Sequence, residues 1–111
     1  MIETILLEYL RGKLSIPVSM ETPPSPPAEF IVMEKTGSGR SDGICSAMFA
    51  VQSNAQSLAR AAEINEQVKA AMDDADALPE IAAVHFNTDY NFTNTASKRM
   101  RYQAVFDVFH Y

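Results

Sequence analysis

Two stretches near the C-terminus decide the fold: residues 82–92, AAVHFNTDYNF, and residues 100–109, MRYQAVFDVF. Apolar side chains occupy alternate positions in both, which is typical of a β-strand with one buried face. The residues predicted to share that face are Ala82, Val84, Phe86, Tyr90, Phe92, Met100, Tyr102, Ala104, Phe106 and Val108. Residues 93–97 supply the turn, so the sequence predicts that the chain closes with a β-hairpin.

A helix is predicted before this hairpin. Ser53 and Gln56 have the spacing of a capping box, in which two side chains satisfy the free N–H groups of a helix start. The residues predicted to form its buried face are Leu58, Ala61, Ala62, Asn65, Val68 and Met72. Acidic residues follow Met72 and Pro79 prevents continuation, so we expect the helix to end near residue 73.

A second hairpin is predicted in the middle of the chain. Residues 29–34, EFIVME, form a short β-rich run, and residues 45–52 alternate in polarity. Between these strands, residues 36–43, TGSGRSDG, are polar and contain three glycines. We therefore expect the two strands to be joined by a long, mobile loop.

The N-terminal third predicts a helix, an edge strand and a connector. Apolar residues recur at helical spacing from Ile2 to Leu10, and Gly12 is expected to end that helix. Residues 14–20 alternate in polarity, but Pro17 lacks an N–H donor and confines such a strand to a sheet edge. Four prolines in residues 23–27 favour a stiff, extended linker, with a docking segment as the alternative.

The resulting order of elements predicts an α+β fold. It reads αβββαββ, or αββαββ if the edge strand does not form, and it forms a single domain over residues 1–111. We expect an antiparallel sheet, with a mixed sheet as an alternative, of four to five strands. Two helices should pack on one of its faces.

Composition narrows the possible functions. The 111 residues carry a net charge of −5, which argues against a protein whose main affinity is for a phosphate backbone. The single cysteine, Cys45, forms no internal disulfide and suits a reducing compartment. The first residues lack the basic start and apolar run of a secretory signal, and no apolar run is long enough to span a membrane.

Catalytic and ligand-binding patterns are weak. Cys45 and His85 lie within predicted strands, where nothing lowers the pKa of a thiol, so a structural cysteine is favoured over a catalytic dyad. The acidic run at residues 73–80 lacks the glycine and alternation of a calcium loop. Gly37 and Gly39 lie between strands rather than before a helix, which disfavours phosphate binding. We expect no catalytic residue, no cofactor and no metal.

Basic residues are the remaining candidates for a functional surface. Lys98, Arg99 and Arg101 cluster near the last turn, and Arg40 lies on the predicted loop. In an acidic protein such residues usually contact carboxylates of a protein partner or remain solvated, and only sometimes contact nucleic acid.

Three segments carry a resemblance to a known family: residues 34–38, EKTGS; 89–93, DYNFT; and 101–106, RYQAVF. Together with the opening helix, the proline-rich connector and the alanine-rich helix, they make nearly the whole chain resemble the minor capsid, tail-completion or tail-terminator proteins of long-tailed bacteriophages and prophages. The resemblance implies a structural virion protein rather than an enzyme. It also implies a similar α+β fold and a location at the head–tail joint, after assembly in the bacterial host cytoplasm.

Members of that family assemble as a hexameric ring on the head-proximal end of the tail tube. The resemblance therefore implies homo-oligomerisation, contact with the tail-tube protein and with a head-completion protein, and no membrane partner. DNA would pass through the lumen only as cargo, which the negative charge suits. Two open sheet edges would suit a subunit completed by its neighbours, and the predicted loop would order on assembly.

The residues predicted to lie at subunit interfaces are Arg40 and Asp42 in the loop, and Arg99 and Arg101 at the start of the last strand. Another head–tail connector or minor capsid protein is the alternative within the same setting. A small-ligand-binding domain is the alternative from a different class, although the sequence offers no convergent set of polar groups for it.

Overall fold

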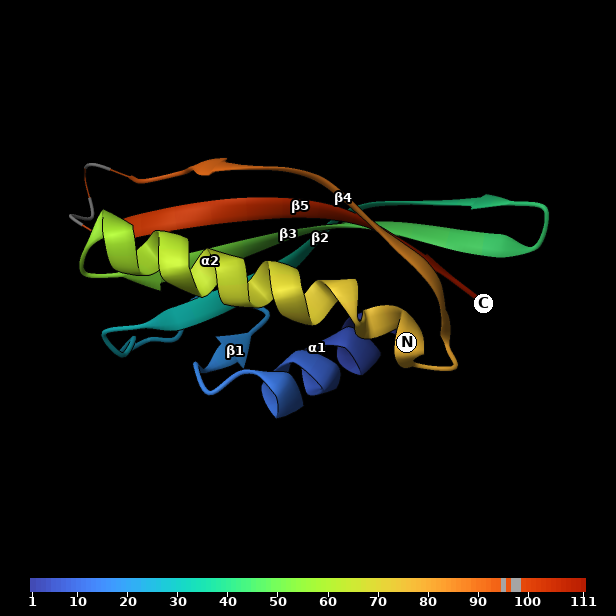
Figure 1. Cartoon of the computed structure of the whole chain (residues 1–111), viewed down its shortest axis with the longest axis horizontal. Helices are drawn as coiled ribbons and strands as arrows, with labels where there is room; N and C mark the ends of the chain where they lie inside the picture. Colours follow the sequence, from blue (N-terminus) through green and yellow to red (C-terminus); the bar gives the residue numbers. More distant parts are fainter. Residues whose placement is uncertain (95, 97–98) are drawn as a thin grey trace.

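The computed structural model describes residues 1–94, 96 and 99–111. Five strands form one sheet in the order β1-β2-β3-β5-β4, with two helices packed on it (Figure 1). The elements are α1 (Ile2–Lys13), β1 (Val18–Ser19), β2 (Phe30–Ser41), β3 (Ile44–Ala55), α2 (Leu58–Asp73), the 3-10 helix η1 (Ala75–Ala77), β4 (Ile81–Asn91) and β5 (Met100–His110). All neighbouring strands are antiparallel except β1 and β2. The predicted α+β class is confirmed, with a mixed sheet.

The core lies between the sheet and the two helices. From β5 it takes Ala104, Phe106 and Val108, as predicted, and each is fully buried. The residues that α2 buries are Ala61, Ile64, Asn65, Val68, Ala71 and Met72. The predicted face was therefore only partly right. It included Leu58, which is 39% exposed, and the half-buried Ala62, and it omitted the buried Ile64 and Ala71.

The C-terminal hairpin forms, but β4 does not keep a single alternation. Phe86 lies opposite Phe106 on the face that carries the helices, and the register then shifts between Phe86 and Thr88. A β-bulge adds a residue to one strand and so exchanges the faces of every residue beyond it. Asp89 consequently faces α2, while Tyr90 lies on the opposite face, beside Gln103. The prediction that Phe86 and Tyr90 share a face was wrong for this reason.

The predicted mobile loop between the central strands is instead a continuous antiparallel hairpin. β2 runs to Ser41 and β3 starts at Ile44, which leaves only Asp42 and Gly43 as the turn. Both have positive φ, 52° and 80°, as a type I′ turn requires and as the right-handed twist of the flanking strands favours. We call residues 36–46 the arm, because this end of the hairpin reaches past both helices (Figure 1). A loop that orders on assembly is therefore excluded for residues 36–41.

Helix α2 begins later than the predicted capping box. Its N-cap is Ser57, whose Oγ accepts a hydrogen bond from the Arg60 N–H at 3.2 Å. Ser53, the predicted cap, lies inside β3 opposite Tyr102 and is fully buried. The spacing from Ser53 to Gln56 thus matched a helix start by coincidence, whereas the predicted end near residue 73 is confirmed.

Two serine variants test whether Ser57 or Ser53 caps α2. Ser57→Ala should lower the free energy of unfolding by about 1 kcal/mol, because it removes the side-chain acceptor of the helix start. Ser53→Ala should be neutral or stabilising, because the Ser53 hydroxyl is buried and has no hydrogen-bond partner among the described residues. Urea unfolding followed by circular dichroism measures both, and a larger loss for Ser53→Ala would contradict this assignment.

The N-terminal third follows its prediction in outline. Helix α1 includes Gly12 and ends at Lys13, so the predicted C-cap role of Gly12 is wrong. The edge strand is confirmed only as the two residues of β1, which run parallel to β2. The carbonyl of Pro17 accepts a hydrogen bond from the Ile31 N–H at 2.8 Å. Residues 20–29, which include the four clustered prolines, connect β1 to β2 without a helix or a strand.

Candidate assembly surfaces

The four predicted interface residues lie at two ends of the sheet. Arg40 and Asp42 lie on the arm, where Arg40 is opposite Cys45 of β3. Arg101 lies opposite Asn54, near the other end of the same strand. At about 3.3 Å per residue, nine residues along β3 separate these ends by about 30 Å. The molecule is 44 Å long, so the arginines do not form one patch.

Arg99 and Arg101 are engaged within the chain. The guanidinium of Arg99 lies 5.0 Å from the centre of the Phe30 ring, and that of Arg101 lies 4.7 Å from the Phe92 ring. Arg101 Nε also donates a hydrogen bond to the Phe92 carbonyl at 2.7 Å. These cation–π contacts assign both arginines a role in covering aromatic rings of their own subunit. Lys98, the third member of the predicted cluster, lies outside the described residues.

One face of the sheet carries no helix, and we call it the helix-free face. Three polar side chains cross it from β3 through β5 to β4. Gln52 Nε2 donates to Gln103 Oε1 at 2.9 Å, and Gln103 Nε2 donates to the Tyr90 hydroxyl at 2.5 Å. Met48 on the same face is 41% exposed. Sequence reasoning missed this ladder, although the signal was present as polar residues alternating with the core positions of β3 and β5.

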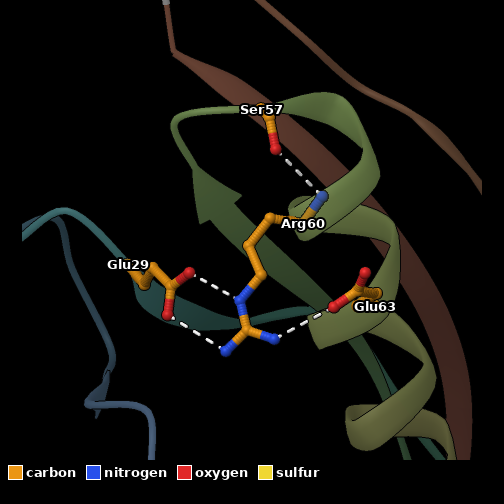
Figure 2. A network of polar contacts seen from close by, with 4 residues as sticks. All are labelled: Glu29, Ser57, Arg60 and Glu63. Atoms are coloured by element: carbon orange, nitrogen blue, oxygen red, sulfur yellow. Dashed lines mark hydrogen bonds and ion pairs between the residues drawn. The ribbon is translucent and has the colours of Figure 1, made fainter.

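Arg60 joins the proline-rich connector to the start of α2 (Figure 2). Its Nε and Nη2 donate to the two carboxylate oxygens of Glu29 at 2.6 and 3.2 Å, and its Nη1 donates to Glu63 at 3.2 Å. The contact from Arg60 holds the pKa of Glu29 below its usual value, and the same contact raises the pKa of Arg60. Such a two-pronged contact fixes orientation as well as distance.

Loss of this contact should free the connector. Arg60→Gln is expected to speed cleavage of residues 20–29 by a nonspecific protease severalfold, because the segment would open more often. Glu63→Gln is the matched control, since it removes only the contact within α2 and should leave cleavage unchanged. Equal cleavage of wild type and Arg60→Gln, measured by mass spectrometry, would show that the ion pair does not restrain the connector.

A groove of about 470 Å³ lies between α2 and β4, at the end of the molecule far from the arm turn. Lys69 Nζ binds Asp89 at 3.0 Å and Glu66 at 3.1 Å, and these carboxylates raise the pKa of Lys69. Asn65 Nδ2 donates to the same Asp89 oxygen at 2.8 Å. The residues lining the groove are Ala59, Ala62, Glu63, Asn65, Glu66, Lys69, Asp89, Tyr90 and Tyr102.

Cys45 does not pair with His85, the histidine considered with it in the sequence analysis. It is opposite His110 of β5, whereas His85 lies on β4, with β5 between the two strands. His110 Nδ1 lies 3.3 Å from the main-chain oxygen of Tyr111. Across the residues the structure describes, no three His, Cys, Asp or Glu side chains are grouped to hold a metal ion. Likewise, no described helix has the length and apolar character needed to cross a bilayer.

No protein-family model matches the chain, and no curated protein matches it.

Proposed function

We propose that the chain is a structural subunit of a bacteriophage or prophage tail, of the tail-terminator kind. In this role copies form a hexameric ring on the head-proximal end of the tail tube, end its polymerisation and offer a surface for a head-completion protein. The chain acts by shape and contact, and DNA passes through the lumen. The sequence resemblance over nearly the whole chain is the origin of this proposal.

The observation that supports it best is the half-covered sheet. Both helices pack on one face, while the helix-free face presents Met48, Tyr90 and Phe92 at 38–41% exposure beside a hydrogen-bonded polar ladder. A mixed apolar and polar surface whose central amide, that of Gln103, is already paired is suited to burial against another protein, because burial leaves fewer donors and acceptors unsatisfied. A subunit of a ring needs such surfaces in addition to its own core.

The sheet edges favour contacts through side chains rather than through added strands. β1 pairs only with Ile31 and Val32, so the outer edge of β2 from Met33 to Ser41 faces no described strand. β4 forms the other edge. Register shifts interrupt β2 once and β4 twice, and bulges of this kind hinder pairing with another chain's strand. We therefore expect subunits of the ring to contact one another through the faces of the sheet and through projecting segments, and not by pairing of edge strands.

A polymerisation assay tests the function. The purified chain is added to a tail-tube protein of a long-tailed bacteriophage, and tube length and the position of the chain are recorded by electron microscopy. We expect shorter tubes with the chain at one end only. Unchanged tube lengths, or binding along the tube wall, would contradict the proposal.

A further inference from the structure

We propose that the arm of one copy docks, through Arg40, in the groove between α2 and β4 of the next copy. This inference deepens the ring assembly proposed above and rests on it. It assigns the two halves of a head-to-tail contact to two named surfaces of one subunit.

The groove offers mainly hydrogen-bond acceptors. Three carboxylates line it, those of Glu63, Glu66 and Asp89. Lys69 binds the last two and Arg60, just outside the lining, binds Glu63, so two cations face three carboxylates. The side chains of Glu63 and Glu66 are 66% and 69% exposed, so both can reach a partner. Ala59 and Ala62 at the same wall are small, which allows another chain to approach α2 closely. An excess of acceptors over donors favours a cationic occupant.

Asn65 lies in the wall of this groove and holds a buried acceptor left unpaired by the described residues. It is 1% exposed, and its Oδ1 has no hydrogen-bond partner among the described residues. The amide orientation is fixed by chemistry, because the opposite orientation would set Oδ1 against the Asp89 carboxylate. A buried carbonyl without a donor costs about 1–3 kcal/mol. An incoming group with several N–H donors, as arginine has, would satisfy the exposed carboxylates, and it would reach this carbonyl only after the Asn65 side chain turned toward the groove.

The arm supplies such a group. The Arg40 side chain is exposed and forms no ion pair or hydrogen bond with any residue of the described part of the chain. It lines a depression of about 420 Å³ together with Lys35 and His110, and no carboxylate lines that depression. The two-residue turn places Arg40 near the tip of a hairpin that reaches past the helices (Figure 1). A preorganised projection loses little conformational entropy when it docks.

The positions of arm and groove suit a ring. They lie at opposite ends of the long axis of the subunit (Figure 1), so an arm cannot reach the groove of its own chain. A contact between two different surfaces is heterologous, and its repetition closes a ring when the rotation between copies allows it. The charge difference between the two ends orients each copy relative to the next.

Charge reversal tests the contact. Arg40→Glu places an acid opposite the groove, and Glu66→Arg places a base opposite the arm, so each variant alone should assemble about tenfold or more weakly than wild type. An equimolar mixture of the two variants should recover rings, because every contact in an alternating ring is then native or fully exchanged. The chain carrying both substitutions should recover rings as well. Native mass spectrometry, alone and with the tail-tube protein, measures the ring fraction.

Glu8→Arg, on the exposed side of α1, is the matched control and should assemble as wild type does. Circular dichroism melting checks that every variant is folded. If wild type forms rings and either variant forms them equally well, or if the mixture gives no recovery, the arm–groove contact is wrong while the proposed function stands. If wild type forms no ring with or without the tail-tube protein, the proposed function fails first.

Discussion

Phe49→Ala is expected to lower the free energy of unfolding by about 3–5 kcal/mol. Phe49 is fully buried at the centre of β3, directly opposite Phe106 of β5, and both belong to the cluster that the helices cover. Removing its ring leaves a cavity that the rigid sheet fills only in part. Because domains of this size are stable by about 5–15 kcal/mol, this loss is a large part of the total.

Met48→Ala is the matched control for that substitution. Met48 is the preceding residue on the same strand, but it lies on the helix-free face and is 41% exposed. Its replacement should cost less than about 1 kcal/mol, because little buried area is lost. Urea unfolding followed by circular dichroism suits a chain without tryptophan. Similar losses for the two variants would show that the core does not lie on the helix-bearing face.

Gly43→Val should give the second largest effect. It should lower the free energy of local opening of the arm by about 2 kcal/mol. Gly43 has φ of +80°, where a Cβ meets the backbone at a cost of about 1–2 kcal/mol and a β-branched side chain costs more. Open space surrounds this glycine, so the effect comes from the backbone alone. Amide hydrogen exchange within residues 37–46 should quicken by about 10- to 30-fold.

Gly37→Ala provides the comparison within the same arm. Gly37 has no positive φ and a Cβ there would meet no atom within 4 Å, so alanine should leave exchange unchanged or slow it slightly. If Gly43→Val left exchange across the arm unchanged, residues 36–43 would be the mobile loop that composition alone predicts. Such a loop could not hold Arg40 in a fixed place.

Hydrophobic periodicity predicted the class of the fold because burial depends on it directly. The alternation at Ala104, Phe106 and Val108 is uninterrupted, and the faces of β5 were assigned correctly along its length. In β4 the bulge near Phe86 exchanges the faces partway along the strand, and the residue types carry no mark of it. Counting alternate residues from the start of such a strand therefore assigns the wrong face to the residues beyond the bulge.

The arm was mistaken for a loop because its residues are polar and small. Both faces of that part of the hairpin are exposed, so no apolar alternation exists there to indicate a strand. The decisive signal was the Asp42–Gly43 pair, which is among the strongest short-range indications of a two-residue turn. Similarly, Ser53 matched a capping pattern that Ser57, four residues later, satisfies in space.

The candidate surfaces were predictable only in part. Arg40 was singled out from its charge, and its exposure on the arm is consistent with that choice. The groove was not foreseen, because α2 and β4 are separated by η1 and because the bulge in β4 places Asp89 beside Asn65 and Lys69. Arg99 and Arg101 were selected from the sequence because they are charged. Their positions over Phe30 and Phe92 depend on how the strands pair, which cannot be predicted from their charge.

The mass of the purified chain in solution, measured by light scattering alone and then with the neighbouring tail-tube protein, tests the central claim most directly. One chain weighs 12.3 kDa, and a hexamer would weigh six times as much. The account predicts a hexamer in at least one of the two conditions. A monomer in both conditions would contradict it.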